Sequence, residues 1–188
     1  MLKRLFDLIV ALACFVLFLP VVVLVAIVIK LDDGGPVFYR GIRVGKDGRS
    51  FGMFKFRSMV INADKIGGPS TSDDDPRLTR TGRMIRKYKL DEIPQPLIVI
   101  KGDMSLVGPR PEVKGEVDHY TCEERLLLNV RPGITDYASI KFHNEGEILK
   151  GSADPHEAYR TLIRPEKMRL GLEYVRNRSF SFDLKILW

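Results

Sequence analysis

The sequence has few residues that could form a disulfide framework or a zinc site. It contains 2 cysteines and 3 histidines in 188 residues, and neither type recurs at metal-ligand spacing. Cys14 stands inside an apolar stretch, so we expect free thiols and a reducing compartment. Internal repeats and low-complexity tracts are also missing from the sequence. We therefore expect one domain with a modest core and no disulfides.

Acidic residues are the minority among the charged ones. The 30 lysines and arginines outnumber the 24 aspartates and glutamates, which gives a formal net charge of +6. This balance suits polyanionic partners, namely nucleic acid, phosphates or anionic lipid. The sequence carries no basic and aromatic motif of a nucleic-acid-binding module, so we expect no nucleic-acid partner.

Charge is absent altogether from Leu8 to Ile29, a run of 22 residues. As a helix this run would be roughly 33 Å long, which is enough to cross the hydrocarbon core of a bilayer. A cleaved signal peptide fits poorly, because its apolar region is usually about 7–15 residues long. The simplest interpretation is one straight membrane span.

Two features favour a bent helix instead. Pro20 removes a backbone donor and clashes with the carbonyl of Val16. Both flanks of the run are basic, and the positive-inside rule places basic flanks on the cytoplasmic side. The basic residues are Lys3 and Arg4 before the run, and Lys30, Arg40, Arg43, Lys46 and Arg49 after it. We therefore predict a re-entrant membrane helix over 1–30, broken at Pro20, that enters and leaves by the cytoplasmic face.

The remainder, residues 31–188, is predicted to be a cytoplasmic catalytic part that forms a single domain with the membrane helix. A β-hairpin is expected over 37–59 around an Asp47-Gly48 turn, followed by a polar loop over 62–76. Helices are expected over 79–89, 91–101, 112–130 and 154–177, with residues 134–153 irregular or partly extended. The predicted fold class is α+β, mainly helical with a small β-hairpin.

The segment KLDEIPQP places Asp91 and Glu92 side by side before a proline. If Asp91 is a helix N-cap, backbone donors and the helix dipole lower its pKa and keep it ionised. An ionised aspartate can attack phosphorus and form an acyl phosphate. Two carboxylates would repel a phosphate, so a divalent cation or arginines must neutralise the developing charge. The cation we expect is Mg²⁺, held by Asp91 and Glu92.

Three basic residues could bind phosphate near this pair. Arg110 stands between two prolines in GPRP, so its backbone is stiff and its guanidinium is well placed for phosphate oxygens. Lys55 in FKFRSM and Arg131 in RPG could add positive charge. Each residue also has a structural alternative, as a helix cap, a turn residue or a solvated strand position. Residue types alone leave the choice open.

Longer motifs narrow the choice. They occur in the order GPVFYRGIRVGKDG, FKFRSM, DPRLTRTGRMIRKYKLDEIPQ, KGDMSLVGPRP, VRPGIT and YVRNRSFSFDLKIL. Together with the proline-containing N-terminal run, they resemble the monotopic phosphoglycosyl transferases of the bacterial sugar transferase family. The resemblance extends from the apolar run to the last residues.

The resemblance implies transfer of a sugar 1-phosphate from a UDP-sugar to a polyprenyl phosphate such as undecaprenyl phosphate. It implies that Asp91 is the nucleophile, that Glu92 assists with metal or protons, and that Lys55 and Arg110 bind phosphate. Mg²⁺ dependence, a place at the bacterial inner membrane and a first membrane step in polysaccharide or glycoconjugate assembly follow in the same way. We also include a homodimer among the expected assemblies.

Three positions depart from the family pattern. Pro96 and Ile98 stand where a bulky apolar residue and an asparagine are usual, and Leu19 replaces a serine before Pro20. After RPGIT the sequence also diverges, and His143 takes the place of an arginine. We therefore expect His143 to contact sugar or nucleotide, while the identity of the sugar stays open.

Two other classes of protein compete with the transferase. A membrane-attached basic scaffold without chemistry would explain the charge and the apolar run, but not the Asp-Glu pair, GPRP and RPG together. A metal-dependent hydrolase of nucleotide sugars or polyprenyl phosphates would use neighbouring chemistry.

Overall fold

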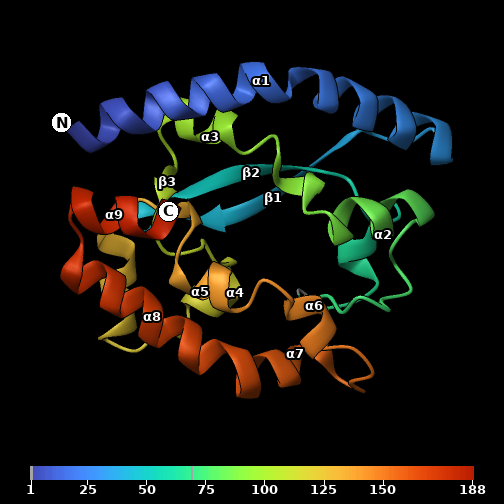
Figure 1. Ribbon diagram of the computed structural model, residues 1–188. Coiled ribbons are helices and arrows are strands. Elements are labelled where there is room, and N and C mark those ends of the chain that lie inside the picture. The colour runs from blue at the N-terminus through green and yellow to red at the C-terminus, as the bar shows by residue number, and fades with distance from the viewer. Residues whose placement is uncertain (1, 69) are drawn as a thin grey trace.

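The first element of the fold is one long helix that lies along one side of the molecule. The computed structural model describes residues 2–68 and 70–188, and its helix α1 covers Leu2–Asp33 (Figure 1). Only four of its residues are buried, namely Asp7, Ala11, Val25 and Ile29. The other apolar side chains of α1 are largely exposed, so the helix presents a wide apolar surface away from the rest of the chain.

The predicted break at Pro20 is absent. We expected two arms separated at this residue, whereas α1 continues through Pro20 as one gently arched helix (Figure 1). Pro20 is exposed on the surface of the helix. A proline removes one hydrogen bond from the helix, and a bend can relieve its clash while the other bonds are kept.

The N-terminal end of α1 is attached to the body by buried polar contacts. Asp7 is 3% exposed and accepts a 2.7 Å hydrogen bond from Ser105 Oγ. Lys3 Nζ donates to Asp183 Oδ2 at 2.6 Å. Arg4 donates to the carbonyl oxygen of Val99 at 2.7 Å. These contacts hold the first two turns of the helix to three separate segments of the chain.

The C-terminal end of α1 is attached to the same body. Asp33 accepts a 2.6 Å hydrogen bond from the Arg57 guanidinium, and Asp32 accepts one from the Thr81 backbone at 3.1 Å. Since both ends contact the body, the helix cannot leave it on the far side of a membrane without breaking one set of contacts.

The predicted hairpin is confirmed. Strands β1 (Phe38–Val44) and β2 (Ser50–Phe56) pair in antiparallel register, with Tyr39 opposite Lys55 and Gly41 opposite Met53. The turn contains Asp47 at φ 57° and Gly48 at φ 73°, which are the left-handed conformations that such a turn needs.

A second, smaller sheet joins two motifs that are distant in sequence. Strand β3 (Ser105–Val107) pairs in parallel with β4 (Gly133–Thr135). A Cβ added to Gly133 would lie 2.1 Å from the backbone nitrogen of Gly108, so only glycine permits this approach. The GPRP segment after β3 and the RPGIT segment of β4 therefore lie side by side.

The helices partly match their predicted ranges. The segment 112–130 is not one helix, since it contains only the short α4 (Lys114–Val117) and a 3₁₀ segment over Glu124–Asn129. Residues 134–153, predicted to be irregular or partly extended, begin within β4 and then contain two short helices, α5 (Tyr137–Lys141) and α6 (Glu145–Ile148). The start of the last long segment is confirmed, because Asp154 caps the backbone of His156 and Glu157. The helices after α1 are α2 (Arg80–Lys87), α3 (Pro96–Lys101), α4 (Lys114–Val117), α5 (Tyr137–Lys141), α6 (Glu145–Ile148), α7 (Pro155–Ala158), α8 (Arg164–Asn177) and α9 (Phe180–Leu187).

The hairpin lies between two helical sides. Helices α1 and α3 run along one side, and α7 and α8 run along the opposite side (Figure 1). The main core packs α1, α3 and β3 against β2, with Ala11, Met53, Val99 and Met104 among its buried residues. This arrangement leaves the other part of the hairpin free to form one wall of a cavity.

Candidate active site

A cavity of about 850 Å³ opens beside the hairpin. Its size falls in the usual range for small-molecule sites. Tyr39, Gly41 and Arg43 come from alternate positions of β1, so they share one face of the strand. Lys55 on β2 and Arg110 after β3 also line the cavity. The hairpin therefore contributes a cationic wall.

Asp91 and Glu92 reach this cavity from a short turn rather than from a helix start. They belong to a 3₁₀ turn, Leu90–Glu92, that follows α2, and the next helix, α3, begins at Pro96 with Gln95 as its N-cap. The prediction that Asp91 caps a helix is therefore wrong. Pro96 takes the first position of α3, where its missing N–H costs nothing, which explains this departure from the family pattern.

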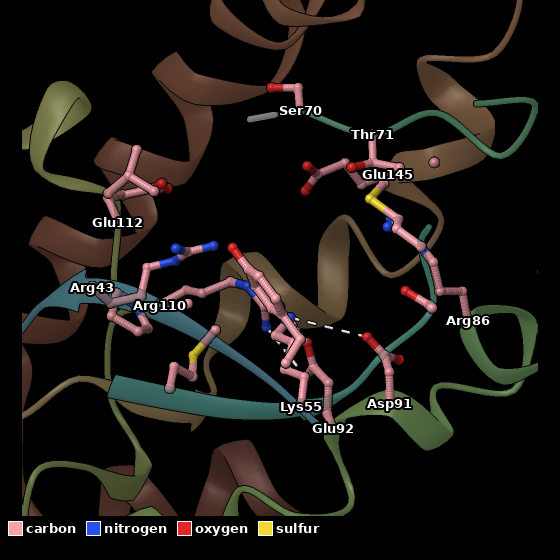
Figure 2. Close-up of a pocket in the computed structure, with 18 of the residues that line it drawn as sticks. Arg43, Lys55, Ser70, Thr71, Arg86, Asp91, Glu92, Arg110, Glu112 and Glu145 are labelled. Carbon is pink, nitrogen blue, oxygen red and sulfur yellow. Dashed lines mark hydrogen bonds and ion pairs between the residues drawn. The ribbon is translucent and has the colours of Figure 1, made fainter. Parts of the chain in front are cut away.

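Four side chains point toward one another in the cavity. Lys55 Nζ lies 2.9 Å from Glu92 Oε1 and 4.0 Å from Asp91 Oδ2. Arg110 donates to both oxygens of Glu92. Figure 2 shows these four groups together, with Arg43 on the Arg110 side and Arg86 on the Asp91 side. The four predicted residues are thus brought into one site.

The two adjacent carboxylates have opposite electrostatic roles. Burial raises the pKa of Asp91, and the positive charge of Lys55 offsets this only in part. Burial acts upward on Glu92 too, but Arg110 and Lys55 hold the pKa of Glu92 well below its usual range. Burial and the charge of Arg110 lower the pKa of Lys55. The predicted lowering of the Asp91 pKa by a helix terminus is therefore wrong.

The hydrogen bonds distinguish the two carboxylates, because in the described part of the chain neighbouring cations donate to Glu92 and not to Asp91. Glu92 is engaged by Lys55 and Arg110, and so it holds these two cations in place. Within residues 2–68 and 70–188, no side-chain donor is within hydrogen-bond distance of the Asp91 carboxylate, and its side chain is 12% exposed. Asp91 is therefore the carboxylate that remains available in the cavity.

The site suits a Mg²⁺ ion that is shared with substrate. The described residues contain no cluster of three or more histidine, cysteine, aspartate or glutamate residues that could enclose a metal. Mg²⁺ is often held by only one or two carboxylates together with substrate phosphates. Asp91 fits that role, whereas the oxygens of Glu92 already accept from Lys55 and Arg110.

The family of the chain follows from a match over its whole length. The family model described as "Bacterial sugar transferase" covers residues 1–188. The chain belongs to the bacterial sugar transferase family. The resemblance predicted from the motifs is confirmed.

Individual members of the bacterial sugar transferase family are similar to this chain over nearly its full length. The "Uncharacterized sugar transferase EpsL" of Bacillus subtilis is 39% identical, over 99% of this chain and 83% of its own length. The "UDP-N-acetylgalactosamine-undecaprenyl-phosphate N-acetylgalactosaminephosphotransferase" of Aeromonas hydrophila is 43% identical, over 99% of this chain and 42% of its own. The "UDP-glucose:undecaprenyl-phosphate glucose-1-phosphate transferase" of Escherichia coli is 38% identical, over 100% of this chain and 39% of its own. This chain therefore spans only about two fifths of the length of the last two proteins.

Of the two other predicted site residues, His143 lies at the cavity and Arg131 does not. His143 is exposed and lines the cavity, where its Nδ1 lies 3.2 Å from the carbonyl oxygen of Ile140. Arg131 is exposed and donates from Nε to the carbonyl oxygen of Gly102 at 2.9 Å. It is not among the described residues that line the cavity, so the structure separates Arg131 from the Asp91 site.

Sequence reasoning missed Arg43 and Arg86 as cavity residues. Both line the cavity, from β1 and α2 respectively. The sequence pattern identifies Arg43 only as a basic residue that flanks the apolar run. Its alternation with Tyr39 and Gly41 was a usable signal, because every second residue of a strand faces the same side.

Proposed function

We propose that the protein transfers a sugar 1-phosphate from a UDP-sugar to a polyprenyl phosphate, such as undecaprenyl phosphate, and releases UMP. Membership of the bacterial sugar transferase family and the substrates named for its relatives support this reaction class. The product would be a polyprenyl-diphosphate sugar for polysaccharide or glycoconjugate assembly.

The proposed reaction has two steps that both use Asp91. In the first step a carboxylate oxygen of Asp91 attacks the phosphorus that carries the sugar, and the bond to UMP breaks. UMP leaves with the electron pair, and an aspartyl phosphosugar remains. In the second step an oxygen of polyprenyl phosphate attacks the same phosphorus, and the Asp91 carboxylate is released.

The observation that carries this proposal is the difference between the contacts of the two carboxylates. Glu92 is held by Lys55 and Arg110, while Asp91 lines the cavity at 4.0 Å from Lys55 and so can attack a bound phosphate. Lys55 and Arg110 would stabilise the negative charge of the transferred phosphate. His143 lines the same cavity and would contact the sugar or nucleotide.

Mg²⁺ belongs to the proposal because the site must receive a negatively charged diphosphate beside a carboxylate. Asp91 and substrate phosphates would hold it. When bound, the ion would neutralise charge on the phosphate oxygens. Glu92 would act through Lys55 and Arg110 rather than as a ligand, in contrast to our prediction from the sequence.

The membrane side of the proposal rests on α1. Its exposed apolar surface needs a covering, and both of its ends contact the same body. Both conditions are satisfied if α1 enters the inner membrane from the cytoplasmic face and returns to the same face. The re-entrant course remains part of the proposal, with a bend at Pro20 rather than a break.

The deciding experiment measures UMP release by the purified full chain with a panel of UDP-sugars, polyprenyl phosphate and Mg²⁺. Asp91→Asn should abolish both turnover and the labelled protein that forms when a UDP-sugar labelled in its sugar is added without acceptor. Asp103→Asn is the control, because Asp103 makes an exposed ion pair with Lys101. An Asp91→Asn enzyme with near wild-type turnover would disprove the nucleophile assignment.

The same assay separates the transferase from a hydrolase of nucleotide sugars. A transferase releases about one equivalent of UMP per enzyme molecule when acceptor is omitted, because the intermediate forms only once. A hydrolase would continue to release product without polyprenyl phosphate. A non-catalytic scaffold would release none under either condition.

A further inference from the structure

Arg43 differs from most cations of the cavity wall because no carboxylate within residues 2–68 and 70–188 forms an ion pair with it. Lys55 and Arg110 contact Glu92, Arg57 contacts Asp33, and Lys167 contacts Glu145. For Arg43, the described part of the chain provides only the carbonyl oxygen of Ile42, at 2.9 Å from Nη1. The remaining donors of its guanidinium are available to a ligand.

The position of this guanidinium is set by Gly41. A Cβ added to Gly41 would lie 3.1 Å from Arg43 Nη1 and 3.1 Å from Tyr39 Cε1. The Arg43 side chain therefore folds back along β1 over Gly41, with the Tyr39 ring on the other side. Since Tyr39 pairs with Lys55, this fold brings the guanidinium toward the reactive end of the hairpin.

The surroundings of Arg43 favour an anion. The residue is half-buried, and Figure 2 shows its side chain directed into the cavity beside Arg110. Burial lowers the pKa of Arg43, and Arg110 acts in the same direction, although Glu112 and Tyr39 oppose it. Arginine stays protonated in proteins, so the cost of burial is met best by a negatively charged ligand.

The chemistry of the proposed transfer identifies that ligand. Phosphoryl transfer places the attacking and leaving oxygens roughly in line on opposite sides of the phosphorus. UMP leaves from the side opposite Asp91 in the first step, and polyprenyl phosphate must attack from that same side in the second. Both are phosphate monoesters, so one subsite can serve each in turn.

We propose that Arg43, together with Arg110, forms the subsite for this exchanging phosphate monoester. The inference rests on the proposed function and adds a residue and a binding step to it. Arg43 would hold the phosphate of UMP as it departs and the phosphate of the polyprenyl acceptor as it attacks. Atoms balance without a further reactant, because one phosphorus–oxygen bond forms and one breaks in each step.

The principal test is Arg43→Gln in the full chain, reconstituted in nanodiscs. The inhibition constant of UMP and the KM for polyprenyl phosphate should both rise about tenfold or more, as expected for the loss of charge-assisted hydrogen bonds. Arg40→Gln is the matched control, because Arg40 lies on the opposite face of β1, exposed above the Phe54 ring. It should leave both constants within about twofold, since a solvent-exposed cation contributes little.

A second variant tests whether Gly41 sets the position of the Arg43 guanidinium. Gly41→Ala should displace the Arg43 side chain and weaken UMP binding, because the new methyl group would crowd Nη1. In the Arg43→Gln background the same change should have little further effect on UMP. Additive effects of the two substitutions would show that Gly41 acts by another route.

Binding without turnover makes the result independent of the transferase assignment. Calorimetry with UMP and with uridine measures what the phosphate adds to affinity, and Arg43→Gln should remove most of that gain. Unchanged UMP affinity would overturn the inference, and a change in only one of the two constants would overturn the shared subsite. If the wild-type chain released no UMP with any UDP-sugar, the proposed function would be wrong. The calorimetry would still show whether Arg43 binds the phosphate of UMP.

Discussion

Asp91 and Glu92 are adjacent carboxylates that their surroundings push in opposite directions. Two cations hold Glu92, and burial dominates at Asp91. Enzymes commonly separate the roles of two carboxylates through such differences in environment. At this site the separation makes Glu92 the permanent anion and Asp91 the group whose charge depends on pH and on bound ligands.

This difference predicts the pH dependence of the first step. Asp91 must be ionised to attack. Its pKa is raised above the ordinary value of 3.8, so activity should already fall at a pH above the one expected for an unperturbed aspartate. Glu92→Gln should move this loss to lower pH in the residual activity, because the charge of Glu92 raises the pKa of Asp91. Single-turnover UMP release without acceptor measures this step alone.

The control for this profile is Asp103→Asn, which changes a partly exposed carboxylate that pairs with the exposed Lys101. Its acid limb should coincide with that of the wild type. An acid limb that is the same in wild type and Glu92→Gln would contradict the coupling between the two carboxylates.

At the scale of elements, α1 is the part whose attachment matters most. Asp7, Lys3 and Arg4 hold its beginning, and Asp32 and Asp33 hold its end. Between these anchors, two short apolar stretches pack against the body, around Ala11 and around Val25 and Ile29. Polar contacts at both ends and apolar packing between them therefore position the helix together.

Asp7→Ala should loosen the N-terminal anchor. The substitution leaves Ser105 Oγ without its buried acceptor, which costs about 1–3 kcal/mol. Each kcal/mol lowers the Tm of a protein of this size by about 2–4 °C. Thermal unfolding followed by circular dichroism in nanodiscs measures the change.

The matched control for Asp7 is again Asp103, whose exposed ion pair should contribute at most about 1 kcal/mol. Equal Tm values for the Asp7→Ala and Asp103→Ala proteins would show that the buried contact does not hold the helix.

At the scale of the whole molecule, the same-side attachment of α1 predicts the membrane topology. In a chain with Cys14 and Cys122 replaced by serine, Leu2→Cys and Leu31→Cys should both react with a membrane-impermeant thiol reagent only from the cytoplasmic side. Both positions are exposed, at 63% and 81%. Arg49→Cys in the hairpin provides the cytoplasmic reference.

Pro20→Ala in the same background tests the bend. If the bend lets both ends share one side, restoring the missing backbone donor should favour a straight helix and expose one end from the opposite side in part of the molecules. Labelling of Leu2→Cys and Leu31→Cys from opposite sides in the unaltered Pro20 chain would contradict the proposed topology.

Local signals in the sequence were sufficient for several elements. The Asp47-Gly48 pair predicted the hairpin because its turn needs left-handed backbone conformations. Asp154 predicted a helix start, which its side chain caps. The predicted helix over 112–130 was wrong because its side chains pack in short turns against β1 and α8, and such contacts override a weak local preference.

The sequence by itself determined which residues form the core of the site. Lys55, Asp91, Glu92 and Arg110 stand in motifs that resemble those of the family, and the resemblance identifies them as site residues. Only the tertiary structure decided what each carboxylate does. Burial raises the pKa of Asp91, and two cations from distant segments hold Glu92. It also assigned Arg43 to the cavity and moved Arg131 away from it. Burial and charge pairing depend on which segments pack together, and that is a property of the folded chain as a whole.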